Sequence, residues 1–348
     1  MEATEEQRIP LAFDAVLIDG QNAGRFLNGL RGRLPLQTKL FVVGSGELEG
    51  LNLGSSDLQT EHLQIYEKLP GGWQAPFVEP SQDQWPWISR PTFHQATLPS
   101  GRPWPKISVV TATYNQGAFL EQTIRSVLLQ NYPNLEYIVI DGGSTDDTST
   151  ILKRYDQELS YCISEKDNGQ SDALNKGFQQ STGEILAWLN SDDRYLPGTL
   201  TRIAMAFDKD QPDMIAGGCL LIEGEAAQPY ARHHTSLPVG EIVSLSLDKL
   251  LDIDGSWYQS DFFYQPEVFW TRQLWERSGS HVDEALYYSM DYELWLRMAQ
   301  QNAQILHILD PLVLFRVHDQ QKTHGGLSTF DSELRQVRER FLQKSQPL

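Results

Sequence analysis

The sequence has little of several features that would each point to a class of protein. It contains two cysteines, Cys162 and Cys219, both in apolar, strand-like stretches. We therefore expect small buried side chains in a reducing compartment and no disulfide framework. Its 28 basic residues are outnumbered by 46 acidic ones, and a formal charge of -18 argues against nucleic acid or an anionic lipid surface as a partner.

Long hydrophobic runs and targeting segments are also lacking. No run of about 18 apolar residues occurs, so the sequence predicts no integral membrane segment. The acidic start M-E-A-T-E-E has neither the basic nor the apolar stretch of a signal peptide, so we expect a cytoplasmic protein. Hydrophobic residues at 40% and charged residues at 21% are normal for a folded globular chain.

Composition along the chain predicts four segments. Residues 1–68 carry one weak β-α-β pattern and are expected to form a small α/β appendage. Residues 69–105 hold eight of the 18 prolines, which predicts an extended connector. Four of the nine tryptophans also lie there and should pack on the main domain: Trp73, Trp85, Trp87 and Trp104. The main domain is expected over 106–325, and a C-terminal helix over 326–348.

The main domain begins with alternating strand and helix patterns. Apolar strands are predicted at 107–111, 137–140, 161–164 and 185–189, and helices at 119–130, 148–155 and 171–180. Strands without a polar face indicate a mostly parallel sheet covered by helices on both sides, which is an α/β fold. Polar residues follow each strand, so a ligand crevice is expected at this edge of the sheet.

Two acidic loops at this edge suggest chemistry. Asp192 and Asp193 follow an apolar strand, and paired carboxylates suit Mg²⁺ or Mn²⁺ together with substrate phosphates, although helix capping is the plainer alternative. The loop from Asp141 to Thr148 lacks both a phosphate-binding lysine and a G-x-G-x-x-G pattern. An acidic loop of this kind suits a ribose and a base, and a capped turn can exist there at the same time.

Five segments, in this order and spacing, resemble the inverting family 2 glycosyltransferases of GT-A fold, from about residue 106 to about residue 318. They are S-V-V-T-A-T-Y-N, V-I-D-G-G-S-T-D-D-T, S-E-K-D-N-G-Q-S-D-A-L-N-K-G, G-E-I-L-A-W-L-N-S-D-D and M-D-Y-E-L-W-L-R. The resemblance implies a nucleotide diphosphate sugar as donor, with a uridine diphosphate sugar as the first choice. This chain has Asp141-Gly142 where the family often has two adjacent acids, so guanosine and thymidine stay open.

The resemblance also implies roles for individual residues. Tyr114 stacks on the base, and Asp141 holds the nucleoside. The nucleotide-sugar-binding set is Thr113, Tyr114, Asp141, Gly143, Asp172, Asn175 and Asp192. For Asn175 a buried structural role is an equal alternative.

The remaining implied roles concern the metal and the base. Asp193 is the expected direct ligand of Mn²⁺ or Mg²⁺, and His318 is a further candidate ligand. Asp291, in the first turn of a predicted helix, matches the position of the general base, with capping as the alternative role and Glu293 as the rival base. We interpret His233, together with His234, as a pair in a solvated loop.

The acceptor is left open as a glycan, a lipid-linked sugar or a protein, and the aromatic residues of 252–275 are expected mostly in the core, with a few at the acceptor. The alternative function is a non-catalytic nucleotide-sugar-binding protein that retains the fold. Retention of Asp193 together with Asp291 favours an enzyme. A nucleotidyltransferase ranks lower, because the loop after the first strand has no basic residue.

Overall fold

The computed structural model describes residues 15–19, 39–43, 66–67, 96–224, 229–259, 262–322 and 327–344. The chain divides into two units, Met1–Val78 and Glu79–Leu348. In the first unit, β1 (Ala15–Asp19), β2 (Lys39–Val43) and β3 (Tyr66–Glu67) form a parallel sheet in that order. The two strands that the sequence predicts in this region are present, and Trp73, Trp85 and Trp87 lie outside the described residues.

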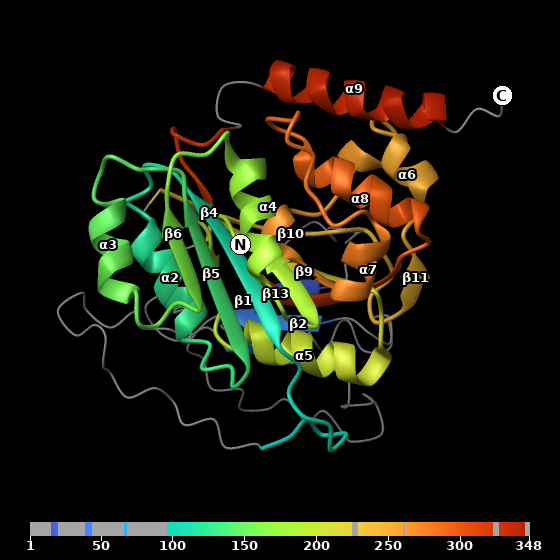
Figure 1. Ribbon diagram of the computed structural model, residues 1–348. Helices are drawn as coiled ribbons and strands as arrows, with labels where there is room; N and C mark the ends of the chain where they lie inside the picture. Colours follow the sequence, from blue (N-terminus) through green and yellow to red (C-terminus); the bar gives the residue numbers. More distant parts are fainter. Residues whose placement is uncertain are drawn as a thin grey trace, which may run out of the picture. The chain divides into compact units, whose positions relative to one another are not determined.

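The second unit is built on a mixed sheet (Figure 1). The predicted parallel strands are β4 (Ile107–Thr113), β5 (Leu135–Asp141), β6 (Tyr161–Ser164) and β7 (Ile185–Trp188). The other strands are β8 (Arg194–Tyr195), β9 (Met214–Glu223), β10 (Ala231–His234), β11 (Ile242–Ser244), β12 (Val268–Thr271) and β13 (Gln304–Val317). The sheet order is β11-β13-β9-β12-β7-β4-β5-β6, with β10 on β9 and β8 on β13.

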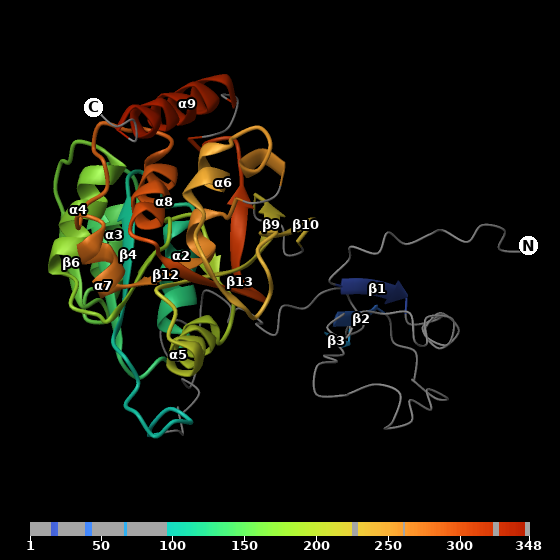
Figure 2. The ribbon, with the colours of Figure 1, turned by 90° about the vertical axis from the view of Figure 1, so that its right-hand side faces the viewer.

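Helices cover both faces of this sheet. One face carries α2 (Leu120–Leu128), α3 (Thr148–Tyr155) and α5 (Thr199–Asp210). The other carries α4 (Gln170–Gln180), α6 (Leu247–Leu251), α7 (Arg272–Arg277), α8 (Met290–Gln300) and α9 (Leu327–Lys344). Two short 3-10 helices, η3 (Trp257–Gln259) and η4 (Gln265–Glu267), precede β12. Figures 1 and 2 show α9 lying across one end of the unit, beside α8.

Successive residues of a strand point to opposite faces of the sheet, so a hydrophobic core lies on each face. Val109 faces one hydrophobic cluster and Val110 the other, and neither is exposed to solvent. Helix α4 packs so closely on the sheet that a Cβ at Gly177 would lie 2.4 Å from Cγ1 of Val110. Trp104 is buried against Tyr132 with ring centroids 5.7 Å apart, so this tryptophan of the predicted connector does pack on the main unit.

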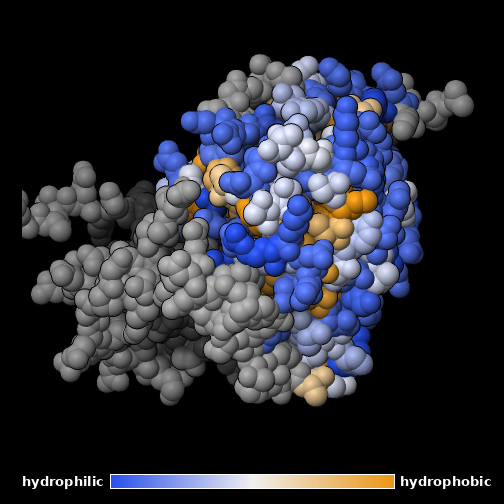
Figure 3. Space-filling view, turned by 60° about the vertical axis from the view of Figure 1, so that its left-hand side comes forward, coloured by the Kyte–Doolittle hydropathy of each residue, from blue (hydrophilic) through white to orange (hydrophobic). Residues whose placement is uncertain are grey.

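The surface of the second unit is largely polar on the face that Figure 3 shows, with small scattered hydrophobic areas. Within the described part of the chain, no helix is long and apolar enough to cross a membrane.

Candidate active site

The loops that follow β4 and β5 are fastened to each other by hydrogen bonds. The backbone N–H of Asn115 donates to Ser144 Oγ at 2.7 Å, and that of Thr145 donates to Asn115 Oδ1 at 2.8 Å. Asn115 takes the left-handed backbone conformation at φ 51°, which asparagine tolerates. This turn leaves Tyr114 58% exposed, while Thr113 is buried with its Oγ1 unpartnered among the described residues. Tyr114 therefore offers an open ring beside a buried hydroxyl.

Asp141 lies beneath these loops. Its side chain is fully buried and accepts hydrogen bonds from the hydroxyls of Ser144 and Ser164, both at 2.5 Å. These bonds join the loop after β5 to the end of β6. They favour a structural role for Asp141 over the predicted direct contact with the nucleoside.

A different carboxylate occupies the space beside Asp141. A Cβ on Gly142 would lie 2.6 Å from Oδ2 of Asp167, which belongs to the loop after β6. Gly143 has φ +83°, and a Cβ there would lie 3.2 Å from the backbone nitrogen of Lys166. The two glycines thus let the loops after β5 and β6 approach closely, and Asp167 fills the place of the second acid that the sequence lacks. Sequence reasoning missed Asp167, although it lies within the S-E-K-D-N-G segment.

The two predicted donor residues on α4 differ in their surroundings. Asp172 is half-buried and accepts from the backbone N–H of Asn168 at 2.9 Å, so it shapes the loop that holds Asp167. Asn175 is buried, and its Nδ2 donates to Val282 O at 3.0 Å and to Glu284 Oε1 at 2.8 Å. Because both of its N–H groups are occupied, the contacts favour the structural role of Asn175 over the predicted donor contact.

The acidic pair after β7 points in two directions. Asp193 is 1% exposed, and its carboxylate accepts from the backbone N–H of Arg316 at 2.9 Å and from Asn190 Nδ2 at 3.3 Å. Burial, reinforced by the neighbouring Asp192, raises the pKa of Asp193 well above its usual range. Asp192 Oδ2 instead lies 3.0 Å from Nε2 of His318. The geometry therefore favours Asp192 rather than the predicted Asp193 as the carboxylate for a metal.

Arg316 holds this strand end in place. Its side chain is fully buried, donating from Nε to Asp192 O at 2.9 Å and from Nη2 to Gln122 Oε1 at 2.6 Å. Its guanidinium lies 4.7 Å from the centroid of the Phe119 ring, on which His318 also packs at 4.5 Å. Arg316 thus joins the Asp192 backbone to Gln122 from inside the fold.

A divalent cation fits the Asp192–His318 pair. One carboxylate and one imidazole suit Mn²⁺, and Mg²⁺ also binds through one or two carboxylates plus substrate phosphates. The described residues contain no group of three or more His, Cys, Asp or Glu side chains arranged for a metal. Phosphate and water oxygens would therefore complete the coordination of such an ion.

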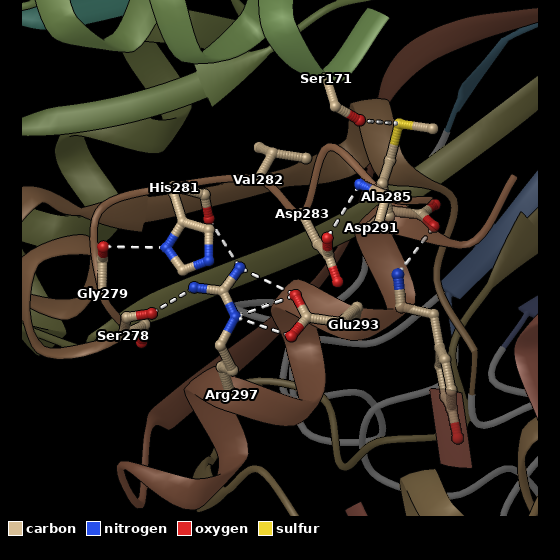
Figure 4. A network of polar contacts seen from close by, with 12 residues as sticks. Ser171, Ser278, Gly279, His281, Val282, Asp283, Ala285, Asp291, Glu293 and Arg297 are labelled. Carbon is tan, nitrogen blue, oxygen red and sulfur yellow. Dashed lines mark hydrogen bonds and ion pairs between the residues drawn. The ribbon is translucent and has the colours of Figure 1, made fainter. Parts of the chain in front are cut away.

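Asp291 lies in the first turn of α8, as the sequence predicts. Burial raises its pKa to about 6, with the charge of Glu333 adding to the rise, while the N–H of Tyr292 and the charge of Lys322 lower it. Glu293, the rival base, is bound by Arg297 Nε at 2.9 and 3.0 Å (Figure 4). Its carboxylate is therefore occupied in an ion pair, whereas Asp291 has no such cationic partner at hydrogen-bonding distance among the described residues.

Contacts from other elements reach the start of α8, where Asp291 lies. Ser171 Oγ lies 3.3 Å from Met290 Sδ, which joins the first turns of α4 and α8 (Figure 4). Lys322 Nζ donates to Tyr287 O at 3.3 Å and lies 4.2 Å from the centroid of that ring. Desolvation lowers the pKa of Lys322 to about 8 against the charges of Glu333, Asp167 and Asp291. The segment from His318 to Lys322 thus runs from Asp192 to the loop before α8.

His233 is not in a solvated loop, so that interpretation was wrong. It belongs to β10 and stacks on Phe262 with ring centroids 4.3 Å apart. Burial lowers its pKa to about 4. Most aromatic residues of 252–275 are in the core, but Phe262 and Tyr264 are only half-buried, and Tyr258 is 42% exposed.

Comparison with known sequences places the chain in a family. Residues 108–275 match the model of glycosyl transferase family 2. An uncharacterized glycosyltransferase of Rickettsia typhi is 30% identical over 229 residues, which are 65% of this chain and 69% of that protein. The chain belongs to glycosyltransferase family 2. An uncharacterized glycosyltransferase of Mycobacterium tuberculosis is 31% identical over 151 residues, or 43% of this chain and 48% of that one.

Solved structures agree on the fold of this glycosyltransferase. TarS 1–349 of S. aureus in complex with UDP-GlcNAc superposes with a TM-score of 0.53 at 18% identity, covering 70% of this chain and 68% of that one. The chain spans only 37% of the longer TarS chain. The predicted GT-A architecture and the assignment as an enzyme are confirmed.

Proposed function

We propose that this glycosyltransferase is an inverting, divalent-metal-dependent enzyme that moves a sugar from a nucleotide diphosphate sugar to an acceptor hydroxyl, with Asp291 as the general base. One observation carries the proposal. Of the two acids at the start of α8, Glu293 is bound in an ion pair, and Asp291 is held beside the donor loops with its pKa raised to about 6.

The donor residues that the geometry supports are Tyr114, Asp167 and Thr113. The exposed ring of Tyr114 offers a face for the base, and the carboxylate of Asp167 offers an acceptor for an N–H of its edge. Asp141, Gly143, Asp172 and Asn175 shape the loops that carry them. A uridine diphosphate sugar is our expected donor, since the TarS fragment with this fold is in complex with UDP-GlcNAc.

Asp192 and His318 would hold the metal, Mn²⁺ or Mg²⁺, with diphosphate oxygens completing its shell. When bound, the cation supplies positive charge that stabilises the leaving diphosphate. Asp193 would support the Asp192–His318 pair indirectly, because its buried carboxylate fixes the backbone of Arg316 two residues before His318.

Asp291 would accept the proton of the acceptor hydroxyl as that oxygen forms its bond to the anomeric carbon. The bond from this carbon to the diphosphate breaks, and its electron pair leaves with the diphosphate. A base with a pKa of about 6 is mostly ionised at neutral pH and is more basic than an ordinary aspartate. The acceptor, a glycan, a lipid-linked sugar or a protein, could stack its sugar on half-buried aromatic rings such as Phe262 and Tyr264.

A donor panel tests this function without knowledge of the acceptor. The protein is incubated with uridine, guanosine and thymidine diphosphate sugars, with Mn²⁺ or with EDTA, and released nucleotide diphosphate is measured. We expect slow hydrolysis of uridine donors that EDTA abolishes. Hydrolysis that is indifferent to EDTA would contradict the metal. Tight nucleotide-sugar binding without any turnover would favour the alternative, a non-catalytic binding protein.

A further inference from the structure

The loop that leads into α8, residues 282–289, is held by side chains from other elements. Asn175 on α4 binds both the N–H and the carbonyl of Val282 at 2.7 and 3.0 Å. Lys322, after β13, donates to the carbonyl of Tyr287. The third element is α9, which reaches the loop through Glu333.

Glu333 collects hydrogen bonds from three consecutive residues of this loop. Its Oε2 accepts from the N–H of Tyr287 at 2.9 Å, and its Oε1 accepts from the N–H groups of Tyr288 and Ser289, both at 2.7 Å. The hydroxyl of Ser289 adds a fourth bond at 2.9 Å. Burial opposes ionisation, but these donors hold the pKa of Glu333 below its usual value. The carboxylate is therefore ionised at neutral pH.

Helix α9, which carries Glu333, is held in place by packing against the rest of the unit. Leu334 and Val337 are fully buried, and Phe341 is 4% exposed, so the helix is part of the hydrophobic core. Arg338 Nε donates to Leu251 O at 2.7 Å, and Arg340 pairs with Asp283 at 3.1 Å. The position of Glu333 is thus fixed by packing, and the bonds that it accepts transmit this position to the loop.

We propose that Glu333 is a positioning residue for the general base, holding the last three residues before α8 so that Asp291 faces the acceptor hydroxyl and keeps its basicity. This inference rests on the proposed function, in which Asp291 is the base. Glu333 lies 42 residues after Asp291 on the helix that ends the described chain, and its hydrogen bonds to described residues join it to the loop.

The electrostatic part of the proposal follows from the charges around Asp291. Lys322 acts from the segment after β13, Glu333 acts from α9, and the N–H of Tyr292 acts from α8 itself. Burial and the charge of Glu333 favour the neutral acid, whereas Lys322 favours the carboxylate. Removal of the Glu333 charge should therefore lower the pKa of Asp291 and weaken it as a base.

Glu333→Gln tests the proposal, with Glu339→Gln as the matched control. Gln removes the charge, and its amide N–H₂ would oppose the N–H of Tyr287. Glu339 lies on the same helix and pairs with its neighbour Arg338. The measurements are the pH profile of UDP release from UDP-GlcNAc or the donor that the panel selects, UDP binding with Mn²⁺, and urea unfolding of each variant with and without Asp291→Asn.

In Glu333→Gln we expect turnover to fall roughly tenfold, UDP binding to stay unchanged, and the acid limb of the pH profile to move down by about one unit. The pH at which the stabilising effect of Asp291→Asn is complete should move down equally, and the effect at high pH should become smaller, which is a readout that needs no substrate. Glu339→Gln should match the wild type. A destabilised Glu333→Gln protein with unchanged turnover and pH midpoint would overturn the proposal.

Two further variants distinguish failure of the proposed function from failure of the positioning role. If Asp291→Asn retains normal turnover, the base is wrong whatever Glu333 does, and the proposed function fails. Should Glu333→Gln not fold, Glu333→Asp keeps the charge on a shorter arm. We then expect a nearly normal pH midpoint with turnover lowered roughly tenfold, and normal turnover in that variant would overturn the positioning role.

Discussion

Acids close together in this enzyme have different surroundings, and we expect different tasks from them. Asp291 and Glu293 lie in the first turn of the same helix, and Asp192 and Asp193 lie in the same segment between β7 and β8. In each pair one carboxylate is occupied by protein donors: Glu293 by Arg297 and Asp193 by the backbone of Arg316. Asp291 and Asp192 are only half-buried, and Asp192 lies beside His318. A role read from residue type alone cannot distinguish the members of such a pair.

The Asp192–Asp193 pair gives a first prediction. Asp192→Ala should keep the fold and abolish the effect of Mn²⁺ on UDP binding, because it removes the carboxylate that faces His318. Asp193→Ala should lower the free energy of unfolding by about 1 to 3 kcal/mol, since it leaves a buried N–H of Arg316 without its acceptor. Calorimetry and urea unfolding separate the two effects. The opposite result would identify Asp193 as the metal ligand: a fully stable Asp193→Ala protein that has lost Mn²⁺-dependent UDP binding, and an Asp192→Ala protein that has kept it.

The acids of α8 should show opposite effects on stability. Asp291 has a folded-state pKa of about 6, above that of an unfolded aspartate at about 3.9. Ionisation of Asp291 therefore destabilises the fold. This destabilisation is absent below the unfolded pKa and reaches its full size above the folded pKa. Asp291→Asn should therefore stabilise the fold by on the order of 1 to 3 kcal/mol at pH 8 and by much less near pH 4. Glu293→Gln should destabilise it by about 1 to 3 kcal/mol. Urea titrations at both pH values check this, and a destabilised Asp291→Asn at pH 8 would contradict it.

At the scale of elements, the loops after β5 and β6 form one donor-binding unit. Gly142→Ala should push Asp167 aside, because the added Cβ would lie 2.6 Å from its carboxylate oxygen. We expect UDP binding to weaken by about tenfold, the loss of roughly one hydrogen bond to a charged group. Asp167→Asn should weaken UDP binding similarly. The control Asp156→Asn, which changes an exposed residue directly after α3, should leave UDP binding unchanged. Unchanged binding in both loop variants would exclude Asp167 from the donor site.

The elements from β4 to β7 could be predicted from sequence, because each apolar strand is followed by a polar loop and amphipathic helices separate the strands. Their order in the sheet, β7-β4-β5-β6, is not their order along the chain, since β7 lies beside β4 and not beside β6. The second half could not be predicted in this way. β12 lies antiparallel between β7 and β9, and β13 pairs with β9 in parallel, so their places depend on partners far along the chain. At the site, Tyr114 and Asp291 were predictable from local motifs, whereas the direction of Asp193 depends on Arg316, and Glu333 depends on the docking of α9.

At the scale of the whole molecule, the catalytic unit begins before the first strand of its sheet. Leu98 and Trp104 are buried in its core, and Ser100 and Arg102 both bind Asp208. A chain of residues 106–348 should therefore be less stable than one of residues 79–348, by about 3 to 5 kcal/mol for the loss of a buried tryptophan and its neighbour. Thermal unfolding of the two chains checks this. Equal melting temperatures would show that residues 79–105 do not belong to the unit.

In the proposed function, Asp291 is the base in a displacement with inversion at the anomeric carbon of a donor held by the loops after β4, β5 and β6. The most direct test is a proton NMR time course of donor hydrolysis by the wild type and by Asp291→Asn, with UDP binding measured on both. We predict that the anomer opposite to that of the donor forms first, and that Asp291→Asn binds UDP normally but hydrolyses the donor at least about a hundredfold more slowly. First formation of the retained anomer, or near-normal hydrolysis by Asp291→Asn, would contradict the account.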